Sequence, residues 1–318
     1  MSLEQFASFS NYAVASATLV IALAWVAYLA QWALGRKFEA SQRIEISELV
    51  PSGSGATTHP PPDNDAAFRS EMASRIGLSL TVLGWLILLA AVVTRALAAQ
   101  RVPWGNMYEF AITGSVIVIG AYLTLVKTSQ IQWLGPILTG FALAVLGSSI
   151  LVYVPAGPLV PALNSYWLYI HVAAAMIGGS GFLVGASASA FYLVKSRAEG
   201  RTPVDQQVGH IWSLPTSEAM DQLAYRANAF AFPVWTFAAL IAGPIWAQYA
   251  WGRYWGWDPK EVWAFITWVI YAGYLHARVT AGWKGKAAAI IALVGFASFL
   301  FNFIGVNLFI TGLHSYAK

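Results

Sequence analysis

The chain alternates between long apolar stretches and short polar connections. A helix needs about 20 apolar residues to cross a hydrocarbon core of roughly 30 Å, and about eight stretches reach that length. We therefore predict an all-α fold, a polytopic membrane protein with about eight transmembrane helices. The predicted helices run approximately from Tyr12 to Leu34, Ile76 to Ala98, Tyr108 to Val126, Trp133 to Val154, Trp167 to Val194, Ala227 to Ala250, Val262 to Thr280 and Ala287 to Thr311.

The composition supports a membrane protein and limits its chemistry. Of the 318 residues, 58% are hydrophobic and only 10% are charged, whereas soluble domains carry about 25% charged residues. The net charge is +4, but the basic residues lie in short clusters between apolar runs, as topology signals do, so we expect a lipid bilayer and no nucleic acid as a partner. The chain has no cysteine, so metal or redox chemistry must depend on histidine, carboxylates or a partner.

The distribution of Lys and Arg predicts the orientation, because cytoplasmic loops carry an excess of both. With the N-terminus outside, most of the 18 Lys and Arg residues fall on the inner side. Both termini and the loop before the seventh helix then face outward. We expect a bacterial inner membrane with the active face toward the periplasm; a thylakoid membrane is the alternative, which the lack of a transit-like N-terminus disfavours.

Three regions follow from this pattern. Residues 1–34 form the first transmembrane helix, which no Lys or Arg precedes, so we expect it to be retained rather than cleaved as a signal peptide. Residues 35–75 form a cytoplasmic loop, in which the stretch "PSGSGATTHPPPDND" predicts disorder. Residues 76–318 form a seven-helix core, with a tryptophan-rich loop over residues 246–262 on the outer face.

The tryptophan-rich loop contains the stretch "WGRYWGWDPKEVW" from Trp251 to Trp263. Asp258, Pro259 and Glu261 have the spacing of a capping box with proline at the first helical position, so the loop precedes the seventh helix. Six of the 15 tryptophans fall between residues 246 and 268. An interfacial aromatic belt is the alternative explanation, but this concentration favours a platform for a flat, apolar ligand.

Two histidines approach the same outer face. His171 lies near the outer start of the fifth helix, and His314 follows the outer end of the eighth. A single histidine there would be an ordinary interfacial residue, whereas two beside an aromatic loop predict a pair of axial ligands to a haem iron. Zinc is the competing metal, but it would require three or four ligands at closer spacing.

His276 lies elsewhere, 14 residues past Val262, or roughly 21 Å along the seventh helix. An ionisable side chain at that depth is a functional candidate, although a structural hydrogen bond to a neighbouring helix is the alternative. Arg278 and Arg226 lie on the same side of the membrane. We therefore predict an inner haem site at His276, with basic residues near the propionates.

These motifs together resemble one family. "WGRYWGWDPKEVWAFITW" is similar to the WWD signature of proteins that handle haem in cytochrome c maturation, and the complete pattern resembles the CcsA (ResC) family of cytochrome c biogenesis system II. "VPWGNMYEF" resembles the outer-loop Asn-x-Tyr-Glu segment of that family. "YIHVAAAM" and "GLHSY" match its two external histidines, His171 and His314, and "YLHAR" matches its membrane-embedded histidine, His276.

The resemblance implies a function and partners. Haem b would be taken up near His276, moved outward, and held between His171 and His314 for covalent attachment to the Cys-x-x-Cys-His segment of an apocytochrome c. The resemblance assigns porphyrin contacts to Trp251, Trp255 and Trp257, and to Asp258 a role in holding the loop. It also implies a membrane partner of the ResB type, so the chain would be a subunit of a thioether-forming synthase complex.

Three alternatives remain at this point. A CcmC-like haem exporter would share the WWD loop and external histidines, but has six helices and no inner histidine. A haem-modifying membrane enzyme resembling haem A synthase would place two histidine pairs inside the bundle. An ion-coupled transporter would require carboxylates near the midplane, whereas Glu109, Asp258 and Glu261 lie at the outer edge.

Overall fold

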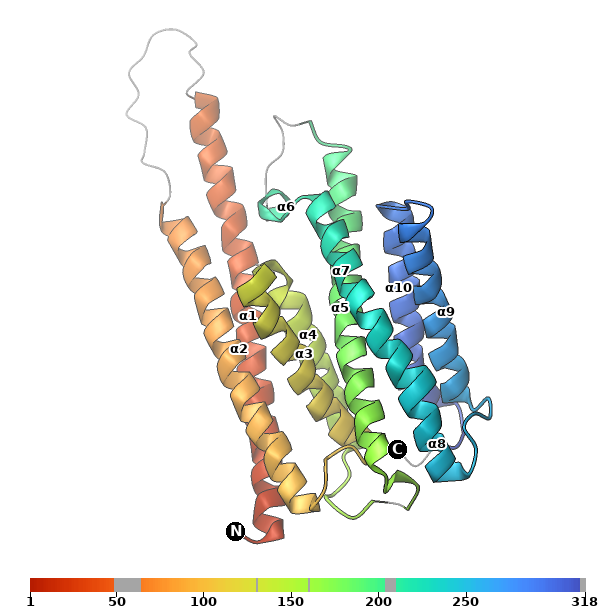
Figure 1. Ribbon diagram of the computed structural model, residues 1–318. Helices are drawn as coiled ribbons and strands as arrows, with labels where there is room; N and C mark the ends of the chain where they lie inside the picture. The colour runs from red at the N-terminus through yellow and green to blue at the C-terminus, as the bar shows by residue number, and fades with distance from the viewer. Residues whose placement is uncertain (49–63, 130, 160, 204–209, 315–318) are drawn as a thin grey trace.

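The computed structural model describes residues 1–48, 64–129, 131–159, 161–203 and 210–314, and in these residues it contains helices and no strand. The helices lie roughly side by side, with the long α1–α2 pair at one flank and the α9–α10 pair at the other (Figure 1). The main helices are α1 (Leu3–Glu48), α2 (Asn64–Ala99), α3 (Met107–Ser129), α4 (Gly135–Ser149), α5 (Tyr166–Glu199), α7 (Ser217–Thr236), α8 (Gly243–Trp251), α9 (Pro259–Val279) and α10 (Lys286–Leu300). Shorter elements are η1 (Gln132–Leu134), η2 (Ile150–Val152), η3 (Pro161–Leu163), α6 (His210–Ser213), η5 (Phe237–Ala242), η6 (Phe301–Gly305) and α11 (Val306–Phe309).

The structure confirms an all-α polytopic membrane protein. Among the described residues, seven helical spans are long and apolar enough to cross a bilayer: Leu3–Leu34, Phe68–Ala99, Met107–Ser129, Gln132–Val152, Tyr166–Glu199, Ser217–Trp251 and Lys286–Phe309. The eighth predicted segment forms α9, whose 21 residues are about 31 Å long. The Trp, Tyr, His and Arg side chains of α9 lower its mean hydropathy, so α9 is less apolar than the seven spans above.

The predicted loop over residues 35–75 is shorter than expected. α1 continues to Glu48 and α2 already begins at Asn64, so helix occupies both ends of that interval. Residues 36–48 are mostly good helix formers and include no proline. The predicted disorder of residues 49–63, including His59, lies outside the described residues.

The bundle is held by close contacts between neighbouring helices. α5 packs along α7, and a Cβ at Gly181 would lie only 2.8 Å from the Cβ of Ala231. Small residues allow helix backbones to approach in this way inside a membrane. The ring of Phe182, also on α5, stacks on Tyr271 of α9 with centroids 3.7 Å apart. α5 is therefore a central helix, which α3, α4, α7, α8 and α10 contact.

Two π-helical segments interrupt long helices. η5 joins α7 to α8, and η6 joins α10 to α11. Pro244 is the second residue of α8 and has no N–H, so it cannot make the ordinary helical bond to Leu240. π-helical turns are rare and occur frequently at functional sites. Both segments contribute residues to the cavity described next.

Candidate functional site

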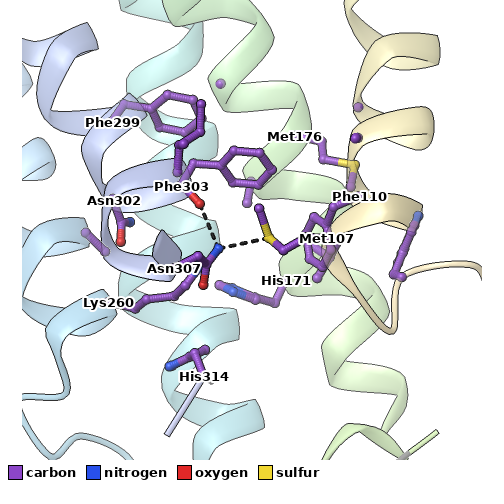
Figure 2. A pocket seen from close by; sticks show the side chains of 18 of the residues that line it. Met107, Phe110, His171, Met176, Lys260, Phe299, Asn302, Phe303, Asn307 and His314 are labelled. Atoms are coloured by element: carbon purple, nitrogen blue, oxygen red, sulfur yellow. Dashed lines mark hydrogen bonds between the residues drawn. The ribbon is translucent and has the colours of Figure 1, made fainter. Parts of the chain in front are cut away.

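A cavity of about 740 Å³ lies at the end of the bundle where α5 begins and α8 ends. Its volume falls within the range of roughly 300–1,000 Å³ that is usual for ligand pockets. Its lining is predominantly apolar and comes from α3, α4, α5, α8, η6 and the loop before α9. His171 and His314, nearly 150 positions apart in the sequence, both line it (Figure 2). The structure thus brings the two predicted outer ligands to one cavity.

His171 is held by the π-helical segment η5. Its Nδ1 lies 2.9 Å from the carbonyl oxygen of Ala238. A carbonyl oxygen only accepts, so Nδ1 carries the hydrogen, and the lone pair of the neutral ring is on Nε2. A Cβ at Gly243 would lie 3.1 Å from this same Nδ1, so glycine there allows the imidazole to approach η5. His171 also stacks on Trp246, with centroids 5.8 Å apart and an angle of 12°.

His314 is held by the carboxylate of Asp258. Its Nδ1 lies 2.9 Å from Oδ2 of Asp258, so it too carries the hydrogen, and its lone pair is on Nε2. Burial lowers the pKa of His314 below the ordinary 6.5, although the Asp258 contact opposes this. Burial alone would raise the pKa of Asp258, but hydrogen bonds from His314 and the Leu313 N–H outweigh it and lower that pKa to about 2. The pair is therefore a neutral imidazole donating to a carboxylate.

Asp258 is also the N-cap residue of α9, and the predicted capping box is confirmed. Its side chain accepts from the backbone N–H of Lys260, while the carboxylate of Glu261 accepts from the N–H of Asp258 at 3.0 Å. Oε2 of Glu261 also accepts from the N–H of Gly256 at 2.8 Å. Oδ1 of Asp258 also accepts a hydrogen bond from the Leu313 N–H at 2.7 Å. The carboxylates of Glu261 and Asp258 together thus fix the loop, the helix start and the segment that carries His314.

The predicted tryptophans do not all face the cavity. Trp251 contacts His314 with ring centroids 4.8 Å apart, and Trp255 lines the cavity. Trp257 is 66% exposed and is absent from the lining, because its backbone has φ = +55° and directs the indole away. Such a left-handed conformation costs on the order of 1–3 kcal/mol in a residue other than glycine. Trp246, which the sequence analysis did not select as a contact, is 3% exposed and lies against both histidines.

His276 is not brought to this cavity. It lies 17 residues after Pro259 on α9, about 26 Å along the helix, and its side chain is exposed on the surface of the bundle. Arg278, predicted to lie near the propionates of an inner haem, donates to both oxygens of Asp221 at 2.8 Å. Asp221 and Arg278 are 11% and 7% exposed, so this ion pair is largely buried.

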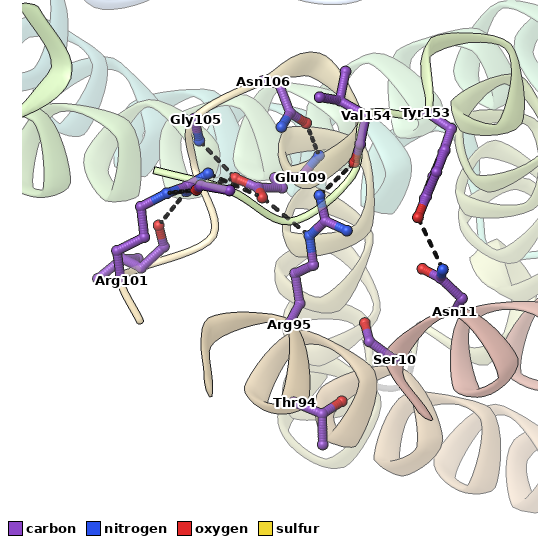
Figure 3. A network of polar contacts seen from close by, with 12 residues as sticks. Ser10, Asn11, Thr94, Arg95, Arg101, Gly105, Asn106, Glu109, Tyr153 and Val154 are labelled. Carbon is purple, nitrogen blue, oxygen red and sulfur yellow. Dashed lines mark hydrogen bonds and ion pairs between the residues drawn. The ribbon is translucent and has the colours of Figure 1, made fainter. Parts of the chain in front are cut away.

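The "VPWGNMYEF" segment forms a second wall of the cavity, and Glu109 anchors it (Figure 3). The Glu109 carboxylate accepts from Nε of Arg95 at 3.0 Å, from Nη1 of Arg101 at 2.7 Å and from the N–H of Gly105 at 2.8 Å. Asn106 caps α3 by accepting from the N–H of Glu109. Since the Glu109 side chain is fully buried and ion-paired, its role is to position the loop that carries Trp104.

The two cavity histidines limit which kind of metal the site could bind. Among the residues that the structure describes, no group of three or more His, Cys, Asp or Glu side chains could hold a metal ion. Two imidazoles in an aromatic cavity suit a metal whose other ligands come from its own flat macrocycle. Hydrogen bonds from Nδ1 to a carbonyl and to a carboxylate are the usual support of histidine ligands.

Comparisons with known proteins identify the family of this chain. A family model described as Cytochrome C assembly protein matches residues 104–314. Proteins described as cytochrome c biogenesis protein CcsA are similar: that of Guillardia theta is 36% identical over 259 residues, covering 76% of this chain and 85% of the relative. The CcsA protein of Synechococcus elongatus is 33% identical over 288 residues, which cover 76% of this chain and 87% of that relative.

A solved structure described as Cytochrome c Heme Lyase CcmF shares the fold. It aligns over 100% of this chain and 49% of its own chain, with a TM-score of 0.64 and 16% sequence identity. This chain therefore spans about half the length of that protein. With the family match extending from Trp104 to His314, across the whole cavity, the chain belongs to the cytochrome c assembly family, in its CcsA group, and has a role in cytochrome c biogenesis.

Proposed function

We propose that the protein binds haem b in the outer cavity and presents it for covalent attachment to apocytochrome c. One observation carries the proposal: His171 and His314 face the same cavity, and each donates its Nδ1 hydrogen to a fixed acceptor. Both neutral rings then have the Nε2 lone pair available for iron. Both ring centroids lie within 6 Å of the Trp246 ring, at 5.8 and 5.6 Å.

The residues of the cavity fit haem as a substrate. The two imidazoles would supply the axial ligands, and the indoles of Trp246, Trp251 and Trp255 would supply flat apolar contacts. Attachment joins the two vinyl groups of haem to two thiols of a Cys-x-x-Cys-His segment. The chain has no cysteine, so both thiols belong to the client. In this proposal the chain is a subunit of a haem-attachment complex, and its role is to hold the haem, orient it and release it.

We further propose that His276 serves an inner haem site shared with a partner of the ResB type, from which haem moves to the outer cavity. The exposure of His276 on the surface of α9 supports this, because a second membrane protein can reach it there. The ion pair with Asp221 commits Arg278 to the bundle, so we assign any propionate contact there to the partner. In this proposal the protein lies in a bacterial inner membrane with the outer cavity on the periplasmic side.

The test is the visible absorption spectrum of the full chain, purified in detergent and titrated with haem, before and after reduction with dithionite. We expect a Soret band and sharp reduced α and β bands, which the double variant His171→Ala/His314→Ala should lose. The control is His276→Ala, which leaves the outer cavity intact. Haem whose spectrum is indifferent to the double variant would refute the outer ligand assignment.

A further inference from the structure

The cavity wall carries one lysine that the proposed histidine ligation does not use. Lys260 is the second residue of α9 and lines the cavity together with both histidines. Figure 2 shows its side chain extending from α9 toward Asn307, with His314 below in that view. Histidines aside, it is the only basic residue among the described residues of the lining.

Lys260 lacks a counter-ion in the described part of the chain. No carboxylate oxygen lies within 4.0 Å of its ammonium group, since the ion pairs there belong to other residues. Two acids lie nearby in the sequence: Asp258, which attracts Lys260 electrostatically, accepts from His314, and Glu261 uses Oε2 for backbone N–H groups while its buried Oε1 makes no hydrogen bond. The ammonium group lies 5.9 Å from the centroid of the Phe303 ring. A partly buried cation without a salt bridge is unfavourable, so the site favours an anionic group.

Two amides extend this polar patch in an otherwise apolar cavity. Asn302 on η6 is 8% exposed, and its Oδ1 has no hydrogen-bond partner. Asn307 donates to the carbonyl of Phe303 at 2.7 Å and contacts the sulfur of Met107 at 2.9 Å. The unused atom of Asn302 is an acceptor, so it indicates a hydrogen-bond donor, such as an ordered water, beside it. The match to a ligand with a large apolar body and an acidic substituent rests on Lys260, the cation in this otherwise apolar lining.

We infer that Lys260 binds a carboxylate substituent of the ligand and so fixes the rotation of the ring within its own plane. This inference rests on the proposed function, in which the carboxylate is a haem propionate. The two propionates lie on one edge of haem and the two vinyl groups lie toward the opposite edge. A propionate at Lys260 directs the vinyl groups away from η6. Histidine ligation alone leaves this rotation open, so Lys260 determines which edge the client meets.

The test compares two probes on the full chain: haem, and haem dimethyl ester, in which both carboxylates are blocked. Lys260→Met removes the charge and keeps the length of the side chain, Lys260→Arg keeps the charge, and Lys284→Met removes an exposed lysine from the α9–α10 connection as a matched control. Dissociation constants come from titration of the Soret band. Loss of one hydrogen bond to a charged group predicts a weakening of about tenfold to hundredfold for haem in Lys260→Met.

The diester should bind Lys260→Met and the unaltered chain equally, and Lys260→Arg should restore most of the preference for haem. Equal weakening of haem and diester in Lys260→Met would overturn the inference, since the lysine would then act on the fold or on a lipid phosphate rather than on the ligand acid. Unchanged haem affinity would overturn it too. In both cases an intact bis-histidine spectrum would leave the proposed function standing, whereas absence of haem binding by the unaltered chain would overturn both.

Discussion

The substitution Asp258→Asn tests whether the His314 tautomer is set by its carboxylate partner. Oδ2 of Asp258 accepts from Nδ1 of His314 at 2.9 Å, and Oδ1 accepts from the Leu313 N–H at 2.7 Å. An asparagine has one oxygen and one NH₂, so one of these two donors must face another donor. If the NH₂ group faces His314, the imidazole must move its hydrogen from Nδ1 to Nε2 so that Nδ1 can accept from the amide. Nε2 then has no lone pair for iron. If the NH₂ group faces Leu313, the backbone beside His314 must move.

The expected magnitude follows from the role of such partners. Replacing the hydrogen-bond partner of a metal-binding histidine costs about 10- to 100-fold in affinity, or about 1.4–2.7 kcal/mol. The start of α9 should be preserved, because asparagine caps helices about as well as aspartate. The effect should therefore appear in haem affinity and not in the folding of α9.

The assay is the rate of haem transfer from the loaded full chain to apomyoglobin, together with the reduced visible spectrum. Glu261→Gln is the matched control, since its amide oxygen can still accept from the N–H groups of Gly256 and Asp258 and it leaves the hydrogen bond between Asp258 and His314 in place. Added imidazole should restore the low-spin spectrum of Asp258→Asn. A transfer rate within twofold of the unaltered chain would refute the argument that Asp258 sets the tautomer.

Other outcomes follow from the same geometry. His171→Ala should abolish formation of c-type cytochromes in cells, with recovery on adding imidazole; full maturation without imidazole would contradict its role as a ligand. Trp255→Ala should speed haem loss severalfold and Trp257→Ala should not, because only Trp255 lines the cavity; equal effects in the transfer assay would contradict this. Gly243→Val should displace the imidazole of His171 and weaken haem binding about tenfold or more, and an unchanged Soret titration would disprove that close contact. Burial holds the pKa of His314 below 6.5, so the midpoint of haem loss on acidification should lie below pH 6.5, where protonation removes the lone pair; a midpoint above pH 6.5 would contradict this.

Much of the fold could be predicted from the sequence, because continuous apolar runs have few alternatives to membrane-spanning helices. The ends of α1 and α2 could not, since their extensions are polar and carry no hydropathy signal. The π-helical segments were also unpredictable. Pro244 lies two residues after η5 and marks a local break there, whereas η6 contains no proline that would mark it in the sequence.

The sequence indicates which residue types gather at the candidate site, but it does not indicate in which direction each side chain points or which distant residue it contacts. The capping box could be recognised because its hydrogen bonds are local, joining residues three apart. The direction of Trp257 could not, because a positive φ in a tryptophan has no sequence signal and turns its indole away from the cavity. Trp246 was missed because its contact with His171 joins positions far apart in the chain. The ion pair of Arg278 was missed because its partner, Asp221, lies on another helix.

The structure gives Asp258 a role that the motif alone leaves open. A carboxylate offers about four lone-pair positions, and Asp258 meets the N–H groups of Lys260 and Leu313 and the imidazole of His314. Three of those positions are thus occupied within the chain, which argues against a direct contact with haem. The same carboxylate begins α9 and orients a histidine 56 residues later, so a movement of the tryptophan-rich loop would also move His314. If haem binds as we propose, a client that displaces this loop would thereby loosen one axial ligand, and docking of the client would be coupled to release of the haem.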